Sequence, residues 1–164
     1  MYNGCVHSSG MMVGDKNEQI IWSTKQCCEE RVSTPDLVFS TPFHIQWWIT
    51  DAEDRLGSII TDVVVNQTVA DGTLQYRLTS LCFPYEAIDR FHSQLQQLVH
   101  HQSNQAKLCD MDMGFSLCFQ VQQTELLILR KDQQVNLQVN LVANSNLVDC
   151  KKCLEDLNQF PKWW

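Results

Sequence analysis

The sequence predicts an α+β domain in which two successive βββα units form one mainly antiparallel sheet with both helices on one face. Apolar and polar residues alternate in several short segments, which is the period of a half-buried strand. Two longer segments repeat their apolar residues every three or four positions, which is the period of an amphipathic helix. Each helical segment follows a group of strand-like segments, so the two helices can cover the apolar face of the sheet.

The strands of the first unit follow from alternation and turn signals. Apolar and polar side chains alternate over residues 43–50 and 74–83, and residues 59–68 are rich in β-branched side chains. The polar segment 51–57 predicts a loop between the first two strands. The pair Asp71-Gly72 predicts a hairpin turn before the third strand, because glycine tolerates the positive φ that tight turns require.

The strands of the second unit show the same signals. Residues 115–122 alternate, and residues 135–141 repeat that alternation. Residues 126–130 are apolar on both sides, which is typical of a central strand. The polar segment 131–134 predicts the turn between the last two strands. Identity between the two units is slight, so we interpret them as a repeated pattern.

One helix closes each predicted unit. The first covers about residues 84–102 and has Pro84 in its first turn, where proline is favoured. The second covers residues 147–160, with Asn144-Ser145-Asn146 as capping residues and Pro161 as its stop. The apolar stripes consist of Ile88, Phe91, Leu95 and Leu98 in the first helix, and of Leu147, Cys150, Leu154, Leu157 and Phe160 in the second.

Residues 1–42 differ from the rest of the chain because they lack a clear apolar period. We interpret the apolar cluster Ile20-Ile21-Trp22 in this segment as a short strand. We expect an N-terminal extension that is loosely ordered or docked on the domain. Residues 43–164 then form a single α+β domain, which is large enough to be stable without metal or disulfide.

Charge and hydropathy narrow the class of partner. The chain has 12 basic and 19 acidic residues and a formal net charge of −7, which argues against a nucleic-acid partner. No apolar run approaches the ~18 residues of a membrane span, and the first residues lack the features of a signal peptide. We therefore expect a cytoplasmic protein, without a membrane partner, whose eight cysteines are reduced thiols.

Cys150 and Cys153 form the short motif that a search for metal or redox sites selects first. Two thiolates at this spacing can hold zinc or cycle as a redox pair. Both residues fall on the apolar stripe of the second helix, so we interpret them as core residues. Cys27 and Cys28 could complete a zinc site, and that alternative stays open.

His100, His101, Cys109, Asp110 and Asp112 form a loose group after the first helix. Adjacent histidines point apart on a helix and the aspartates are typical of loops, so we favour a loop over a metal site. The sequence also has no glycine-rich phosphate loop, no serine nucleophile elbow and no His-Glu-x-x-His motif. We therefore predict a protein that is not an enzyme and that needs no cofactor or metal.

Trp48, Asp51, Glu53 and Asp54 are the candidate residues for binding a partner protein. Trp48 lies on the polar face of its predicted strand, and an exposed tryptophan there would be a binding anchor. Residues 1–40 could instead fold back and cover this side chain. The three acids in the predicted loop could form an anionic patch for a cationic partner, or simply a solvated turn.

Three segments resemble the WapI-type immunity proteins, which neutralise the toxic tips of bacterial polymorphic toxins. These segments are Phe43-His-Ile-Gln-Trp47, Tyr85-Glu-Ala-Ile-Asp-Arg-Phe-His-Ser-Gln-Leu-Gln-Gln-Leu98 and Leu154-Glu-Asp-Leu-Asn-Gln-Phe-Pro161. The resemblance covers residues 43–161 and leaves the N-terminal extension unmatched. It implies a stoichiometric inhibitor that caps a cationic toxin domain without doing chemistry, and it assigns no fixed functional residue.

Three function classes follow from these observations. The first is an immunity-type inhibitor of a bacterial toxin. The second is a small accessory or adaptor subunit that docks in a cytosolic complex through its sheet. A thiol or zinc enzyme built on Cys150 and Cys153 would be the third. The sequence leaves the oligomeric state and the identity of the partner open.

Overall fold

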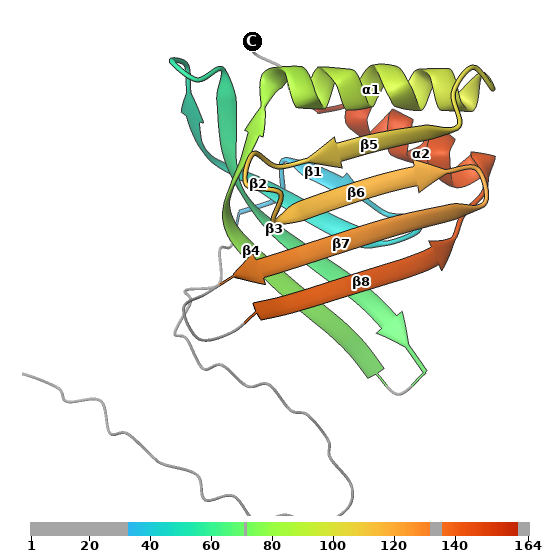
Figure 1. Cartoon of the computed structure of the whole chain (residues 1–164), viewed down its shortest axis with the longest axis horizontal. Helices are drawn as coiled ribbons and strands as arrows, with labels where there is room; N and C mark the ends of the chain where they lie inside the picture. Colours follow the sequence, from blue (N-terminus) through green and yellow to red (C-terminus); the bar gives the residue numbers. More distant parts are fainter. Residues whose placement is uncertain (1–32, 71, 132–135, 161–164) are drawn as a thin grey trace, which may run out of the picture. The chain divides into compact units, whose positions relative to one another are not determined.

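The computed structural model describes residues 33–70, 72–131 and 136–160 (Figure 1). The chain divides into two units, Met1–Val32 and Ser33–Trp164, and the first unit lies outside the described residues. The expected short strand at residues 20–22 therefore stays a prediction. The described part is α+β, as the sequence predicts.

The described strands form two separate antiparallel sheets of four strands each, in the orders β1-β2-β3-β4 and β5-β6-β7-β8 (Figure 1). The predicted single sheet of two βββα units is therefore wrong, because each half of the chain builds its own sheet and has the order ββββα. The strands are β1 (Leu37–Phe39), β2 (His44–Glu53), β3 (Ser58–Val69), β4 (Gly72–Pro84), β5 (Gln105–Cys109), β6 (Phe115–Gln120), β7 (Gln123–Lys131) and β8 (Asn136–Asn144).

Two strands were not predicted, β1 and β5, and both are edge strands. They are short, so their alternation covers too few residues to stand out in the sequence. Each is held by pairing with a longer neighbour, as in the register pairs Leu37 with Trp47 and Ala106 with Phe119. The predicted hairpin before β4 is confirmed by the pairing of β3 with β4, although Asp71 itself lies outside the described residues.

The two helices are shorter than predicted. Helix α1 spans Tyr85–Val99 and α2 spans Leu147–Asn158. Pro84 is the last residue of β4 rather than part of the helix, and the N–H of Tyr85 donates to the carbonyl of Gly57 at 2.8 Å. Neither described helix has the length and apolar content needed to cross a membrane.

The predicted cap of α2 is confirmed. Asn146 Oδ1 accepts the N–H of Val148 at 2.7 Å, and Asp149 Oδ2 accepts the N–H of Asn146 at 2.8 Å. Together these bonds form a capping box, which satisfies N–H groups that the first helical turn leaves free. Thr41 Oγ1 donates to Asp149 Oδ1 at 2.5 Å, so the same cap also fixes the segment between β1 and β2.

Aromatic side chains from both sheets form the centre of one shared core. Trp47 of β2 stacks on Phe83 of β4 with ring centroids 4.7 Å apart. Phe115 of β6 meets both rings edge-on, at 6.1 Å from Trp47 and 5.8 Å from Phe83. Phe91 of α1 extends this cluster by contacting Phe39 and Phe119. The inner faces of the two sheets are therefore joined by rings rather than by aliphatic side chains alone.

Each helix packs against the sheet formed by the other half of the chain. Helix α1 follows β4 but contacts chiefly β5 and α2, whereas α2 follows β8 and contacts β1 (Figure 1). Between the helices, His92 Nε2 and Asn158 Oδ1 lie 2.7 Å apart. The expected position of both helices on one face of a single sheet is therefore wrong. The helices instead lie against the two short edge strands.

Two neighbouring tryptophans provide a matched test of this core. Trp47 is 1% exposed at the contact between the sheets, whereas Trp48 points to the opposite side of β2. We expect Trp47→Ala to lower the free energy of unfolding by about 3–5 kcal/mol, because it leaves a large cavity. Trp48→Ala should cost about 1 kcal/mol or less. Urea unfolding of both variants measures the difference, and equal losses would contradict the assignment of faces.

Candidate functional site

A β-bulge in β2 sets the direction of the candidate binding residues. The register of β2 on β3 shifts between Ile49 and Asp51, so Thr50 is an extra residue in the strand. Thr50 Oγ1 donates to the carbonyl of Ile60 at 3.1 Å and holds the bulge. Beyond it, Ala52 pairs with buried Ile59 and packs against the core. The alternation of facing is thereby reversed after the bulge.

The bulge places Trp48, Asp51 and Glu53 on the same outer face of the first sheet. Trp48 points outward before the bulge because its neighbour Trp47 points into the core. Asp51 and Glu53 point outward after it because Ala52 between them points inward. The predicted loop over 51–57 is therefore wrong in its first half, since β2 continues to Glu53. Only residues 54–57 form the turn, and Asp54 lies at its start.

The side chain of Trp48 is half-buried. It is therefore neither the fully exposed anchor nor the fully covered residue that the sequence leaves as alternatives. Its Nε1 donates to the carbonyl of Ser33 at 2.9 Å, which fixes the orientation of the indole ring. Asp36 follows in the same segment, and its Oδ2 accepts the N–H of Ile49 at 2.7 Å. The described end of the extension thus lies along β2, while Trp22 lies outside the described residues.

Apolar neighbours of Trp48 also lie on this face, and they are not among the candidate residues expected from the sequence. Ile60 pairs with Asp51, and Val64 lies two positions beyond the residue opposite Trp48. Both side chains are half-buried yet do not belong to the core cluster. Alternation within residues 59–68 could have indicated these two neighbours, because every second β-branched side chain in that strand must face away from the core. We call Trp48, Asp51, Glu53, Ile60 and Val64 the outer β2–β3 surface.

Two charged residues of the sheet complete this surface electrostatically. Asp62 pairs with Trp48, and its Oδ1 accepts the N–H of Ser80 at 3.2 Å, so it supports a second irregularity between β3 and β4. Arg77 of β4 is exposed and pairs with Val64, so it faces outward as well. Arg55 in the adjoining turn is also exposed. Acids still outnumber bases on this side of the first sheet.

The structure does not bring together the loose group of histidines, cysteine and aspartates. His100 and His101 are exposed beyond the end of α1, whereas Cys109 ends β5 and Asp112 lies in the following loop. The four steps from Gln105 to Cys109 alone span roughly 14 Å in an extended strand. Within the described ranges, no three His, Cys, Asp or Glu side chains are placed to hold a metal ion.

Asp110 has a structural task in that loop. It is only 4% exposed, and its Oδ1 accepts the N–H of Phe115 at 2.7 Å. Burial raises the pKa of its carboxyl above the ordinary value, an effect that hydrogen bonds from backbone N–H groups partly oppose. The N–H of Met111 donates to the carbonyl of Cys82 at 2.8 Å. Asp110 therefore holds a loop that presents the exposed side chains of Met111 and Met113.

Cys150 and Cys153 are core residues, as the sequence predicts. Both are 0% exposed and belong to the same apolar cluster as Leu157. Burial raises the pKa of the Cys150 thiol, and it raises the pKa of Cys153 well above its usual range. Each thiol is therefore held in its neutral, weakly reactive form. Cys27 and Cys28, which could complete a zinc site, lie outside the described residues.

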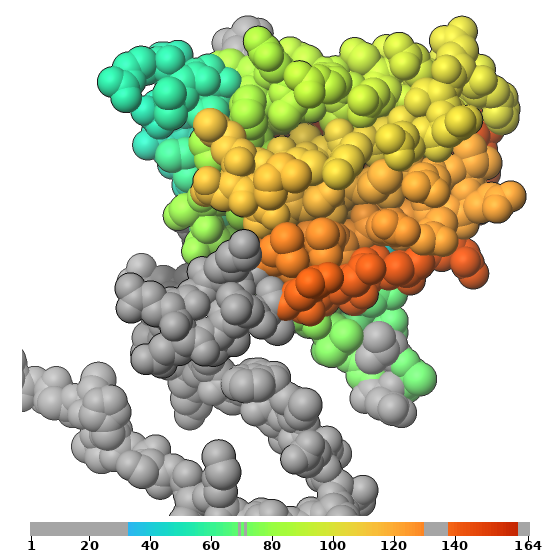
Figure 2. Space-filling model, viewed as in Figure 1, coloured from blue at the N-terminus to red at the C-terminus, as the bar shows by residue number. Residues whose placement is uncertain are grey.

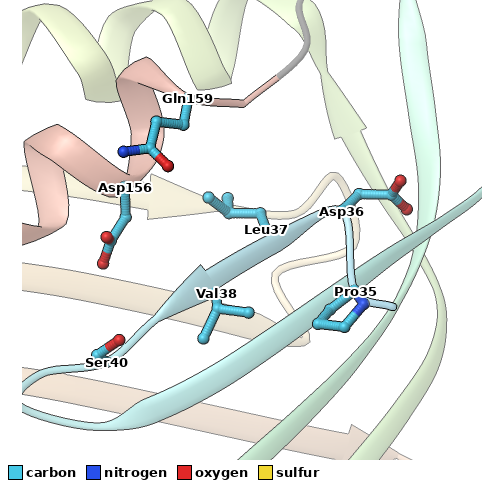
Figure 3. A pocket seen from close by; sticks show the side chains of 7 residues that line it. All are labelled: Pro35, Asp36, Leu37, Val38, Ser40, Asp156 and Gln159. Atoms are coloured by element: carbon cyan, nitrogen blue, oxygen red, sulfur yellow. The ribbon is translucent and has the colours of Figure 1, made fainter. Parts of the chain in front are cut away.

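A shallow cavity of about 290 Å³ lies between β1 and the end of α2 (Figure 3). Its two carboxylates, Asp36 and Asp156, come from opposite ends of it (Figure 3). Asp36 already accepts the N–H of Ile49, and Asp156 Oδ1 lies 2.9 Å from Lys152 Nζ. Asp36 is therefore engaged by the fold, whereas Asp156 Oδ2 is buried with no hydrogen-bond partner among the described residues. The lining consists of Pro35, Asp36, Leu37, Val38, Ser40, Asp156 and Gln159.

Comparison of the chain with protein-family models, with curated proteins and with solved structures finds no match. The resemblance to the WapI-type immunity proteins therefore stays a prediction. The geometry itself defines a candidate binding surface on the described part of the chain. On that surface one tryptophan, two β-branched side chains and two carboxylates share the outer face of a sheet.

The buried carboxyl of Asp110 predicts a pH dependence of stability. Because its pKa is raised in the folded state, its contribution to stability is greatest at acid pH and is lost as the pH rises through that pKa. Asp110→Asn keeps the oxygen that accepts from Phe115 but cannot ionise. The stability of this variant relative to the parent should therefore rise from about pH 4 toward pH 7. Urea unfolding across this range gives the difference, and a relative stability that falls with pH would contradict the assignment.

The buried thiols predict a protected pair. In denaturant a thiol reagent should count close to eight cysteines, whereas the native protein should give fewer. Cys153→Ala should remove one thiol from the denatured count and none from the native count, because Cys153 is inaccessible and its pKa is raised. Cys82→Ala, at a half-buried position, is the control and should lower both counts. A native count that drops with Cys153→Ala would show that α2 opens in solution.

Proposed function

We propose that this chain is a non-catalytic protein-binding protein, an immunity-type inhibitor that caps a cationic toxin domain through its outer β2–β3 surface. The observation that carries the proposal is the bulge at Thr50, which turns Asp51 and Glu53 to the same side as Trp48. A regular strand would have turned Asp51 into the core. The bulge therefore builds a continuous surface of mixed apolar and acidic character, and bulges of this kind often mark functional sites.

The side chains of this surface suit a protein partner. Protein interfaces concentrate their binding energy in a few aromatic or arginine anchors near the centre of the contact. Trp48 can act as such an anchor, since its indole is already oriented by the hydrogen bond to Ser33. Ile60 and Val64 supply apolar surface beside it, and neither belongs to the core cluster. A preformed anchor loses little conformational entropy when the partner binds.

The charges of the surface favour a cationic partner. Asp51, Glu53 and Asp54 lie at the end of β2 and in the adjoining turn, and the whole chain carries a net charge of −7. Exposed charges of this kind raise the rate of association with an oppositely charged protein. They contribute less to the lifetime of the complex, because solvent screens them within about 8 Å at physiological salt. A nuclease-type toxin that binds phosphates presents the required cationic surface.

The proposal predicts that charge and anchor variants act on different rate constants. Replacing Asp51, Glu53 and Asp54 together by Asn or Gln should slow association with the toxin and flatten its salt dependence. Trp48→Ala should instead speed dissociation and cost about 2 kcal/mol of binding free energy. The proposal implies a toxin encoded beside this protein's gene, and surface plasmon resonance with that toxin at two salt concentrations measures both rate constants.

Arg77 offers a control of opposite sign. It is exposed on the same outer face, so Arg77→Gln should leave the association rate unchanged or raise it slightly. Co-expression of each variant with the toxin then reports protection of the cell. If the triple acid variant and Trp48→Ala both protect as well as the parent and keep its kinetics, the outer β2–β3 surface is not the binding face. If no toxin is retained at all, the accessory-subunit class replaces the inhibitor.

A further inference from the structure

The two sheets have four edge strands, β1, β4, β5 and β8, and three of these edges are protected. An open edge carries unpaired N–H and C=O groups and invites pairing with another chain, so natural proteins cover, charge or distort their edges. Here β1 has three residues and lies against α2, while β5 lies against α1. The edge formed by β4 is distorted where its register on β3 shifts, and it carries Arg77.

Strand β8 has none of these protections among the described elements. Its nine residues, Asn136–Asn144, include no charged residue, no proline and no glycine. Its register on β7 is continuous from Gln123 opposite Asn144 to Lys131 opposite Asn136. Within the described residues it pairs with β7 alone, and it forms the lower border of the front sheet in Figure 2. The outward Val142 of this strand is 55% exposed.

We propose that β8 is a dimerisation edge, which pairs antiparallel with β8 of a second copy of this chain about a two-fold axis at Asn140. In that register Asn140 faces Asn140, Gln138 faces Val142, and Val139 faces Leu141. Pairs related by this axis keep the same facing, so polar outward residues meet outward residues and half-buried inward ones meet inward ones. The β5–β8 sheets of the two copies then join into one eight-stranded sheet. This is an isologous contact, of the kind that closes a dimer.

Charge distinguishes a second copy from other occupants of this edge. A chain with a net charge of −7 repels itself wherever acidic surfaces meet. At β8 this repulsion is smallest, because none of the facing residues is charged. On the neighbouring strand β7, Glu125 lies one strand further in, opposite Val142. A cationic partner gains little electrostatic attraction at this neutral edge. The β8 strand of a second copy is uncharged and of the same length, so it can form backbone hydrogen bonds along the whole edge.

The test uses the full-length protein in sedimentation velocity over a range of concentrations. The parent should show a concentration-dependent monomer–dimer equilibrium. Asn140→Lys should weaken self-association at least about fivefold, because it places two like charges directly opposite each other across the axis. Gln138→Lys is the matched control: the same substitution in the same strand faces Val142, and the two new charges lie beyond about 8 Å. This variant should keep the dimer.

Mixing provides the decisive outcome. Asn140→Lys and Asn140→Glu chains should each dimerise poorly alone and should dimerise together, because only at the two-fold axis does a residue meet its own counterpart. A monomeric parent at all concentrations overturns the proposal, whether the edge stays open or is taken by another segment of the chain. A dimer that Asn140→Lys leaves intact also overturns it and assigns the interface to another surface.

Discussion

The contact of Phe115 with Trp47 and Phe83 is the interaction on which the arrangement of this protein depends. At this contact the two sheets meet, and the ring centroid of Phe115 lies 6.1 Å from that of Trp47 and 5.8 Å from that of Phe83. Edge-to-face packing of this kind requires a defined geometry as well as apolar area. It therefore sets the relative position of β2, β4 and β6, and through β2 it also determines which side chains face away from the core.

The outer face gains its character from a single irregularity. Trp47 faces the core at one end of β2 and Ala52 faces it at the other. The two residues are an odd number of positions apart, so regular alternation would place them on opposite faces of the strand. Only an extra residue between them, Thr50, satisfies both constraints. The same residue that reconciles the packing thus aligns Trp48 with Asp51 and Glu53. Packing of the core and composition of the candidate surface are therefore coupled.

Local signals made part of this structure predictable. The cap of α2 rests on Asn146 and Asp149, which lie within one turn, so the sequence shows it directly. Alternation gave the facing of most strands but not their partners, so one sheet could not be told from two. Strand β1 is too short to display a period, and β5 buries only Ala106 and Leu108. The bulge escaped because polar Asp51 after Thr50 has the composition of a loop, although Ala52 carried the opposite signal.

The exchange of helices between the two halves constrains how a newly synthesised chain acquires this structure. The first sheet is complete in sequence at Pro84, yet α2, which packs against its edge strand β1, begins only at Leu147. The hydrogen bond from Thr41 to Asp149 spans 108 positions of the chain. Contacts between residues so far apart in the sequence form slowly, because a long loop must close first. On the ribosome, the edge strand β1 can therefore gain its cover from α2 only after residues 147–158 have emerged.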